Sequence, residues 1–437
     1  MYRRSPLLAS AAVLTLLAAC SSESNPVATP PPVVARINVT APSSAIPVGG
    51  TTAVTATVTA DNGSLVVDRA VDWVSSNLNI ATVTATGKLT ATVQGVGPGT
   101  VIISAKLDGK FGSVSLISSH PQPPPPRQGF LWSEADGFTI IAPLPGATAS
   151  FPVGINSAGT VVGHGNGREP RSFIWRRSRG TPLDLGLLPG STACYAKAIN
   201  DAEQVVGTCY FQQSTSRAFR WTAAAGMTEV GVPAGAVGST ATSINSAGEI
   251  GGASLVSSGS TFVAKPGRWN SAGVFESLKL PGLTTYGVVT GIDDAGNAVG
   301  WASDGSDYYS PVAAVLWKRG SSTETVIEAC VQFGCATFPS AMSRNGRVAG
   351  FRNSMAFIWT EAAGFTDYPS LSGANFSQAT GINDSGQAAV NEYFNVRVQP
   401  WIISPTGVRR ALVGPPGTTS ANATAINNAG QVVGYAG

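Results

Sequence analysis

Charged residues and histidine are scarce in this chain. Only 12% of its 437 residues are Asp, Glu, Lys or Arg, and its two histidines are His120 and His164. The 27 basic and 24 acidic residues nearly balance, so the sequence offers no basic face of the kind that nucleic-acid binding needs. No combination of acid, histidine and nucleophile recurs. The sequence therefore predicts no catalytic residues, no metal, no cofactor and no nucleic-acid partner.

Three local clusters have a plain interpretation as solvated loops. His164 follows a glycine in a stretch that runs to Gly167, which indicates a solvated loop. The basic run Arg176–Arg179 follows Trp175 and is interpreted in the same way. The segment from Asp304 to Asp307 has carboxylates but lacks the full set of oxygen ligands that calcium takes, so a polar turn is favoured.

Long apolar runs are also missing, with one exception at the N-terminus. Arg3 and Arg4 precede the apolar run Leu7–Ala19, the pattern of a secretory signal peptide over residues 1–19. No other stretch reaches the ~20 apolar residues of a membrane span. We therefore expect a mature chain with 25 basic and 24 acidic residues that is exported and not threaded through a membrane.

The end of the signal sequence, Leu17-Ala18-Ala19-Cys20, resembles the lipobox of bacterial lipoproteins. This resemblance implies that Cys20 carries the lipid and anchors the protein to a membrane. Ser21 in the next position implies sorting to the outer membrane of a Gram-negative cell, facing either the periplasm or the outside. The alternative is an ordinary signal peptide with a chance cysteine.

Four cysteines follow Cys20, and in an oxidising compartment they predict two disulfides. Of the three connectivities we favour the local one, Cys194–Cys209 with Cys330–Cys335. Cys194 and Cys209 bracket the segment 200–203 symmetrically and face each other if that loop has four residues. A three-residue loop with a bulge would place them on opposite faces.

Helical periodicity is weak, whereas glycine is abundant, with 51 residues, so the mature chain is predicted to be all-β. Residues 34–118 alternate apolar and polar positions between Gly- and Asn-rich turns, which is typical of a small β-sandwich. A tether over 20–33 and a Pro-rich linker over 119–128 flank this unit.

Residues 34–118 also resemble the bacterial Ig-like domain, group 2. The resemblance rests on Ile46–Gly49, Val71–Asn77, Ile80–Val83, Gly87–Ala91 and Gly95–Ile102, which occur in the expected order. It implies an adhesin-type or spacer module without catalysis, in which Trp73 is a core residue.

Residues 129–437 contain a phrase that recurs seven times, at about 44 residues per unit. One part is an apolar stretch that ends in Trp, and another reads Ile-Asn and then Val-Val-Gly after a turn. The seven tryptophans are Trp132, Trp175, Trp221, Trp269, Trp317, Trp359 and Trp401. A period of this length with four short strands predicts a propeller blade.

The repeat region begins and ends in the middle of a unit. Its first part, Phe130–Gly146, carries the Trp and Leu elements, and its last part, Ala425–Gly434, carries the Ile-Asn and Val-Val-Gly elements. Two half-units make one whole blade if the chain closes into a ring, which leaves no open sheet edges. We therefore predict a seven-bladed β-propeller in preference to a linear solenoid.

The turns between the Ile-Asn and Val-Val-Gly strands follow one form. Asn or Asp opens a type I turn and Gly occupies the position with positive φ. Asn200–Glu203 breaks this form because Glu203 stands where Gly belongs, and we hypothesise that the Cys194–Cys209 disulfide offsets the poorer turn. A ring of tryptophans could stack sugars, but packing between blades is the favoured interpretation.

The repeats resemble the HAF family of extracellular repeats. The resemblance rests on segments such as Ala198–Asn200 with Val205–Gly207, Arg217–Trp221 and Leu183–Gly186; the His-Ala-Phe triplet appears here as Arg-Ala-Phe and Met-Ala-Phe. The family implies architecture and exposure and gives no catalytic residues to transfer.

The sequence as a whole predicts a membrane-anchored envelope lipoprotein that binds a surface glycan or a protein partner through its propeller. The insertions at 252–268 and 300–316 are the candidate binding loops. The alternatives are a propeller enzyme, a glycan lyase or hydrolase, whose charged side chains gather at the ring's centre, and a purely structural envelope protein.

Overall fold

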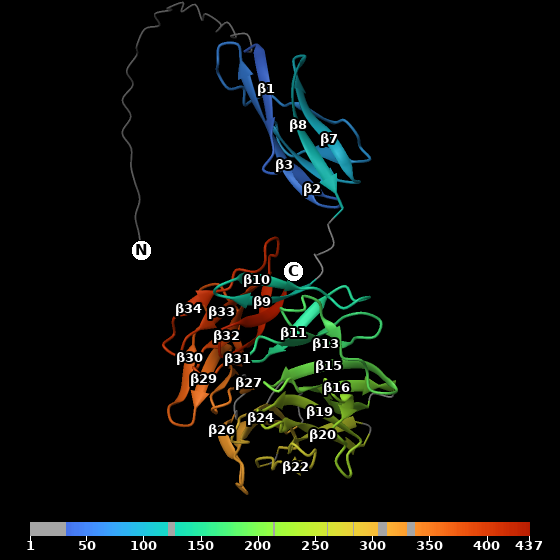
Figure 1. The fold of residues 1–437 in the computed structure, drawn as a ribbon. Coiled ribbons are helices and arrows are strands. Elements are labelled where there is room, and N and C mark those ends of the chain that lie inside the picture. Colours follow the sequence, from blue (N-terminus) through green and yellow to red (C-terminus); the bar gives the residue numbers. More distant parts are fainter. Residues whose placement is uncertain are drawn as a thin grey trace, which may run out of the picture. The chain divides into compact units, whose positions relative to one another are not determined.

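The computed structural model describes residues 32–120, 127–212, 215–259, 261–282, 284–304, 313–329 and 337–437. The predicted lipidation site, Cys20, and the second predicted cysteine pair, Cys330 and Cys335, lie outside these residues. Every regular element from β1 to β36 is a strand, as predicted (Figure 1). The chain divides near residue 123 into two compact units, which are described separately.

The N-terminal unit is a sandwich of two four-stranded sheets. One sheet has the order β1 (Val34–Thr40), β3 (Thr51–Ala60), β6 (Thr90–Gly95), β5 (Ala81–Ala85). The other has the order β2 (Ala45–Pro47), β8 (Lys110–Ser119), β7 (Gly99–Leu107), β4 (Asp72–Ser75). Alternate residues of β3, from Val54 to Ala60, point into one core, and Trp73 packs against that core as predicted.

The C-terminal unit is built from seven four-stranded antiparallel sheets, which are the predicted blades. The first strand of each blade lines a central channel. In blade order these strands are β11 (Ser150–Ile155), β15 (Ser191–Ile199), β19 (Gly238–Ile244), β23 (Tyr286–Ile292), β27 (Thr337–Met342), β31 (Phe376–Ile382) and β35 (Ala421–Ile426).

The second strands carry the Val-Val-Gly segments. They are β12 (Val161–Gly165), β16 (Val205–Phe211), β20 (Ile250–Ser258), β24 (Ala298–Ser303), β28 (Val348–Arg352), β32 (Ala388–Tyr393) and β36 (Val432–Ala436). The third strands carry the tryptophans. They are β13 (Ser172–Trp175), β17 (Ser216–Thr222), β21 (Thr261–Trp269), β25 (Ala313–Trp317), β29 (Met355–Thr360), β33 (Val398–Ile403) and, in blade 7, β9 (Gln128–Ser133).

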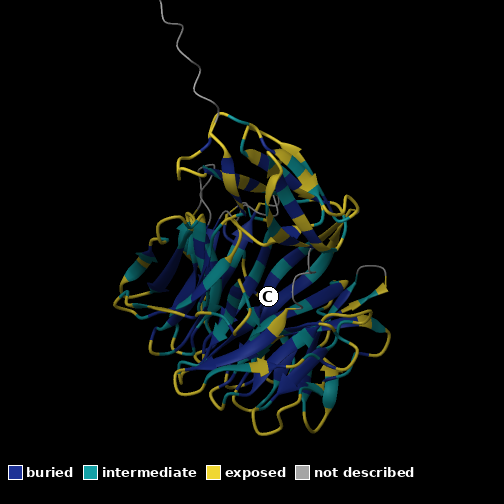
Figure 2. Ribbon diagram, turned by 90° about the horizontal axis from the view of Figure 1, so that it is seen from above, coloured by how far each residue is buried: buried dark blue, intermediate teal, exposed yellow. Residues whose placement is uncertain are grey.

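The outer strands are short and complete each blade. They are β14 (Leu183–Asp184), β18 (Gly226–Glu229), β22 (Phe275–Ser277), β26 (Thr325–Ala329), β30 (Gly364–Tyr368), β34 (Arg409–Ala411) and, in blade 7, β10 (Gly137–Ile141). The inner strands are largely buried, whereas exposed residues gather in the connecting loops (Figure 2).

Blade 7 closes the ring with strands from both ends of the repeat region. Its order is β10-β9-β36-β35, and β36 pairs antiparallel with β9. Val432 lies opposite Trp132, Val433 opposite Leu131 and Gly434 opposite Phe130. The red C-terminal strands therefore lie beside the teal β9 and β10 (Figure 1). The predicted blade shared between the two ends is confirmed.

The recurring Gly and Phe of the repeat form a pair across neighbouring strands. In blade 2, Gly207 lies opposite Phe219. A Cβ atom on Gly207 would lie 2.1 Å from the Tyr195 carbonyl oxygen and 2.8 Å from the Phe219 ring, so only glycine fits. The same pairing joins Gly434 to Phe130. In each pair the phenylalanine ring packs over the glycine, which has no side chain in the way.

The seven tryptophans are packing residues, as the sequence predicts. Six of them are buried, and Trp175 and Trp269 are each only 1% exposed. Trp401 in blade 6 is partly exposed and lies opposite Val390, at the register position that Phe219 takes in blade 2. Ile403, opposite Ala388, takes the register position of the other tryptophans. A sugar-stacking ring of these tryptophans is therefore not present on the surface of the described blades.

The disulfide Cys194–Cys209 is present, but the register that produces it differs from the expectation. Five residues, Asn200 to Gln204, separate the last paired residues, Ile199 and Val205, so the turn does shift the register by one. A β-bulge at Lys197 shifts it back, and Cys194 then lies opposite Cys209.

The irregular turn of blade 2 has a second support besides the disulfide. Glu203 has a φ of 56°, in the region that favours glycine. Its carboxylate pairs with Arg176 and accepts a 2.9 Å hydrogen bond from the Thr160 hydroxyl, both in blade 1. Arg177 pairs with Asp136. Arg176 and Arg177 thus lie in a turn at the protein surface, as the sequence indicated, and each also pairs with a carboxylate.

Replacing both Cys194 and Cys209 by Ala is expected to lower the free energy of unfolding by about 3 kcal/mol. The bond closes a segment with a sequence separation of 15, and the loss of such a cross-link releases conformational entropy in the unfolded chain. Denaturant unfolding of the variant beside the oxidised and reduced wild type measures this. An unchanged midpoint would show that the disulfide does not offset the turn at Glu203.

Candidate functional site: the central channel and its two ends

The central channel is lined by one β-bulge from each innermost strand. The turn that follows each innermost strand shifts the pairing by one residue, and the bulge restores it. The seven bulge residues are Val153, Lys197, Thr242, Thr290, Ser340, Thr380 and Thr424. Together with the two residues that follow each of them, they enclose a cavity of about 240 Å³.

The threonines of this ring join adjacent blades. The Thr242 hydroxyl donates to the Val289 carbonyl oxygen of blade 4 at 2.6 Å, and the Thr424 hydroxyl donates to the Pro152 carbonyl oxygen of blade 1 at 2.8 Å. The Thr380 hydroxyl reaches blade 7 in the same way, at 3.0 Å from the Ala423 oxygen. These hydroxyls stabilise the ring and have their hydrogen-bonding capacity largely used.

Lys197 replaces the threonine in blade 2, and it makes no hydrogen bond or ion pair with any residue in the described ranges. Among the described residues that line the cavity, it alone is charged. Solvent in the channel reaches its side chain, but the surrounding strands enclose it, and this burial lowers the pKa of Lys197. A cation held in this way provides a positive potential inside the channel.

His164 lies next to this cation, in strand β12, and not in the solvated loop that the sequence indicated. Its ring stacks on Phe151 at 5.4 Å between centroids and meets Tyr195 edge-on at 5.0 Å. Burial first and the charge of Lys197 second lower the pKa of His164 to about 4. The imidazole is therefore neutral at physiological pH.

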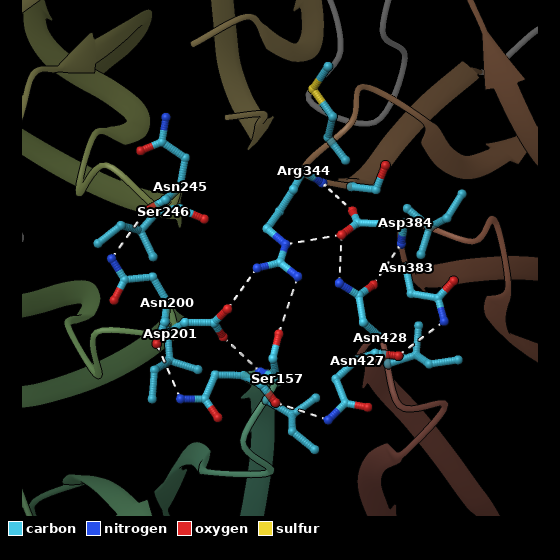
Figure 3. A pocket seen from close by; sticks show the side chains of 18 residues that line it. Ser157, Asn200, Asp201, Asn245, Ser246, Arg344, Asn383, Asp384, Asn427 and Asn428 are labelled. Carbon is cyan, nitrogen blue, oxygen red and sulfur yellow. Dashed lines mark hydrogen bonds and ion pairs between the residues drawn. The ribbon is translucent and has the colours of Figure 1, made fainter. Parts of the chain in front are cut away.

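One end of the channel carries the seven turns, which are joined by a ring of hydrogen bonds (Figure 3). Each turn asparagine donates its side-chain N–H to a backbone carbonyl of the next blade, as Asn200 does to Asn245 at 3.1 Å and Asn427 to Asn156 at 2.9 Å. Five of the seven steps have this bond, and blades 4 and 5 lack it because Asp293 and Ser343 have no amide. The recurring Asn therefore has a role between blades as well as within its turn.

Arg344 lies across the turn end of the channel (Figure 3). Its guanidinium pairs with Asp384 of the next blade at 3.1 Å and with Asp201 of blade 2 at 2.7 Å, and it donates to the Ser157 hydroxyl of blade 1 at 3.3 Å. Burial opposes the ionisation of Asp201, but the Ser157 amide and Arg344 outweigh it and lower the pKa of that carboxyl. The polar groups at this end thus satisfy one another.

The opposite end of the innermost strands carries partly exposed ring side chains, which we call the aromatic face. Over blades 7, 1 and 2 they form a continuous series, in which Phe151 contacts Tyr435 at 5.2 Å and Tyr195 contacts Tyr210 at 5.8 Å. The full set is Phe151, His164, Tyr195, Tyr210, Tyr286, Trp301, Phe338, Phe351, Phe376, Tyr393 and Tyr435.

A second group of the aromatic face lies over blades 4 to 6. Trp301 stacks on Tyr286 at 5.4 Å and meets Phe338 edge-on at 6.0 Å. In blade 6, Phe376 and Tyr393 stack at 4.2 Å. Arg127 lies over the Tyr435 ring at 5.4 Å and adds a cation to this end. The face combines flat apolar rings with hydroxyl, imidazole and indole groups, which suits a ligand that is partly apolar and partly polar.

The sequence-predicted binding loops overlap the aromatic face in part, because Trp301 of the segment 300–316 belongs to it. The segment 252–268 forms most of the long β20–β21 hairpin, whose tip exposes Phe262. Residues 305–312 of the other insertion, with most of the candidate calcium loop, are outside the described residues. Across the described ranges, no three His, Cys, Asp or Glu side chains gather to hold a metal, and no helix has the length and apolarity of a membrane span.

Comparison with known proteins identifies the family of the N-terminal unit. Residues 33–117 match the bacterial Ig-like domain (group 2), which confirms that resemblance. The chain is similar in structure to virginiamycin B lyase from Staphylococcus aureus, at 10% identity and a TM-score of 0.44, over 71% of this chain and 99% of that one. No curated protein matches the chain.

Two further solved structures give similar values. Oligogalacturonate lyase from Vibrio parahaemolyticus has 8% identity and a TM-score of 0.44, over 71% of this chain and 96% of that one. A putative TolB from Agrobacterium tumefaciens has 10% identity and a TM-score of 0.40, over 71% and 97%. The family match and the sheet topology together describe a group 2 Ig-like domain followed by a β-propeller. The Ig-like domain and the disulfide are typical of extracytoplasmic proteins.

Proposed function

We propose that this protein is a cell-envelope lipoprotein whose propeller binds a glycan through the aromatic face, with the Ig-like domain as a spacer. The observation that carries the proposal is the continuous series of partly exposed rings at one end of the channel. Flat rings offer large contact area at low entropic cost, and the tyrosine hydroxyls add hydrogen-bonding groups at the edges. Sugar rings present the complementary surface, with apolar C–H faces and a polar rim.

The turn end of the channel supports a ligand less well than the aromatic face. Its largest polar side chain, Arg344, already has two carboxylates and a hydroxyl as partners. A ligand there would have to replace those bonds, whereas Tyr195, Phe338 and their neighbours offer partly exposed rings. The resemblance to HAF repeats and to lipoproteins with a lipidated Cys20 supports placement at the outer membrane, on either side of it.

Removing rings from the aromatic face is expected to weaken glycan binding. Tyr195→Ala and Phe338→Ala should each lower the affinity of the protein from Ser21 onward by about tenfold or more, because central aromatic anchors dominate binding energy. A glycan array followed by titration of the bound glycans measures this. Phe111→Ala in the Ig-like domain and Val408→Ala in the β33–β34 turn are controls, because they remove apolar side chains that are 75% and 69% exposed outside the aromatic face.

The outcomes separate the proposal from its alternatives. Loss of binding in the two aromatic-face variants with retention in both controls supports it. Equal binding by all four variants, or no glycan bound by the wild type, would contradict it and favour a protein partner or a structural role.

A single observation favours the enzyme alternative. His164 is neutral above about pH 4 and lies beside a cation, which is an arrangement that could serve proton transfer. We propose binding without turnover, because no carboxylate lines the channel cavity among the described residues. Incubation of each bound glycan with the protein, followed by an assay for new reducing or unsaturated ends, tests this, and product formation that depends on His164 would overturn it.

A further inference from the structure

Lys197 is the most unusual residue of the channel wall. In the other blades the bulge position holds Thr, Ser or Val. Three of the threonine hydroxyls donate a hydrogen bond to a backbone carbonyl oxygen of the next blade. Blade 2 lacks such a hydrogen bond to the next blade, and Lys197 places an ammonium group in the channel at this position. The Lys197 side chain makes no hydrogen bond between blades among the described residues, so stabilisation of the propeller ring does not explain why a lysine is there.

The surroundings of Lys197 provide no counter-charge. The described residues that line the cavity are otherwise aliphatic or hydroxyl-bearing, and the carboxylates at the turn end are engaged by Arg344. Between the cavity at Lys197 and the turn end, the channel wall is apolar and includes Ile199, Ile382 and Ile426. Lys197 is exposed to the channel and has no acid beside it, so an anion that enters the channel can form a direct ion pair with it.

The positive charge of Lys197 also acts on a residue of the aromatic face. Its charge reaches His164, whose ring is sandwiched between Phe151 and Tyr195. A ligand lying on these rings is therefore within reach of the potential of Lys197. Arg127 over Tyr435 places a second positive group at the same end.

We infer that the glycan bound at the aromatic face is acidic, and that one of its anionic groups, a carboxylate, sulfate or phosphate, enters the channel and pairs with the Lys197 ammonium. This inference rests on the proposed function and names the class of ligand. The rings bind the sugar, and Lys197 selects for charge. Such selection by one enclosed charge pair amounts to about tenfold or more in affinity.

The chain contains its own reporter for this pairing. It has two histidines, so their imidazole proton resonances are resolved in an NMR titration, with His120 outside the channel as the reference. An anion that neutralises Lys197 removes one of the two causes that lower the pKa of His164, so this pKa should rise. Glucuronate, glucose 6-phosphate and glucose at matched ionic strength are the probes, with the protein from Ser21 onward.

The expected result is a raised pKa of His164 with glucuronate or glucose 6-phosphate, none with glucose, and no response to any probe in Lys197→Met. Lys318→Met is the control, because Lys318 pairs with Glu361 away from the channel, and it should respond like the wild type. Absence of a response in the wild type, or an unchanged response in Lys197→Met, would overturn the inference. The wild-type titration keeps the test decisive if Lys197→Met does not fold.

Failure of this inference is distinguishable from failure of the proposed function. If acidic and neutral glycans bind equally and only the Tyr195→Ala and Phe338→Ala variants lose them, the aromatic face binds sugars without charge selection. If acidic probes act on His164 but no glycan depends on the rings, the channel is an anion site and the proposed function is wrong. The responses to carboxylate and phosphate show which anion the channel prefers.

Discussion

A chain that ends at Asn422 is expected not to form the propeller. The deletion removes β36 and most of β35, so β9 loses its partner and blade 7 is reduced to the β9–β10 hairpin. Phe130 and Leu131 would lose their contacts, although both are at most 1% exposed in the intact ring. An isolated two-stranded hairpin is marginal in water, and the neighbouring blades would present unpaired edges.

We expect this shortened chain to lose the cooperative unfolding transition of the propeller and to aggregate. Near-ultraviolet circular dichroism and tryptophan fluorescence during denaturation measure this, because the seven repeat tryptophans all lie in the propeller. A chain that lacks the Ig-like domain, residues 21–120, is the control and should unfold like the wild-type propeller. A shortened chain that still unfolds cooperatively, at a slightly lower midpoint, would indicate an open array instead of a ring.

Glu392→Ala is expected to lower the free energy of unfolding by about 3 to 5 kcal/mol, the usual result of breaking a buried ion pair. The Glu392 side chain is fully buried, and its Oε1 accepts hydrogen bonds from Arg409 at 2.5 Å and from the Leu371 amide at 3.1 Å. The variant leaves Arg409, whose side chain is 19% exposed, without its carboxylate, and it frees the loop before β31.

The double variant Glu392→Leu/Arg409→Leu separates the ion pair from packing. Replacing both partners by apolar residues leaves no unpaired buried charge, so it should recover much of the loss. Chemical denaturation of the wild type, Glu392→Leu, Arg409→Leu and the double variant gives the coupling free energy. A loss below about 0.5 kcal/mol for Glu392→Ala, the range of surface substitutions, would show that this pair does not hold the loop.

The repeat allowed much of the propeller to be predicted. A residue that recurs in most units reports a constraint common to their blades, such as the Gly–Phe pair of blades 1, 2, 5 and 7 or the tryptophan that is buried in six blades. The half-units at the two ends predicted the closure between β36 and β9 because a ring is the arrangement that leaves no edge. The Asn of each turn was predicted to act within its own turn, but its bond to the next blade could not be derived, because that contact depends on the curvature of the ring.

The candidate site was not predicted, although part of its signal recurs. Lys197 occurs once, and its place in the channel depends on a bulge that compensates for the shift of the turn. Four rings directly follow the glycine of the Val-Val-Gly segment, namely His164, Trp301, Phe351 and Tyr435. Phe151 and Phe338 lie opposite two of these rings, in first strands. A signal existed in the departures from the repeat, since Lys197 stands where other blades have a hydroxyl.

The register and the curvature of the ring also explain the error about His164 and the partner of Arg176. His164 lies two positions after the Val-Val pair, where the sequence has glycines on both sides and resembles a loop. Pairing of β12 with β11 brings it under Phe151, which only the register reveals. Arg176 and Glu203 are 27 residues apart and meet because the turn of one blade lies beside the third strand of another.

Hydrogen exchange measured with and without a bound acidic glycan tests the central claim most directly, because it locates the ligand without any substitution. The account predicts slower exchange in the first residues of β11, β15 and β27 and at the ends of β12 and β28, which carry the aromatic face. Slower exchange confined to the turn end around Arg344, or to the Ig-like domain, would contradict it.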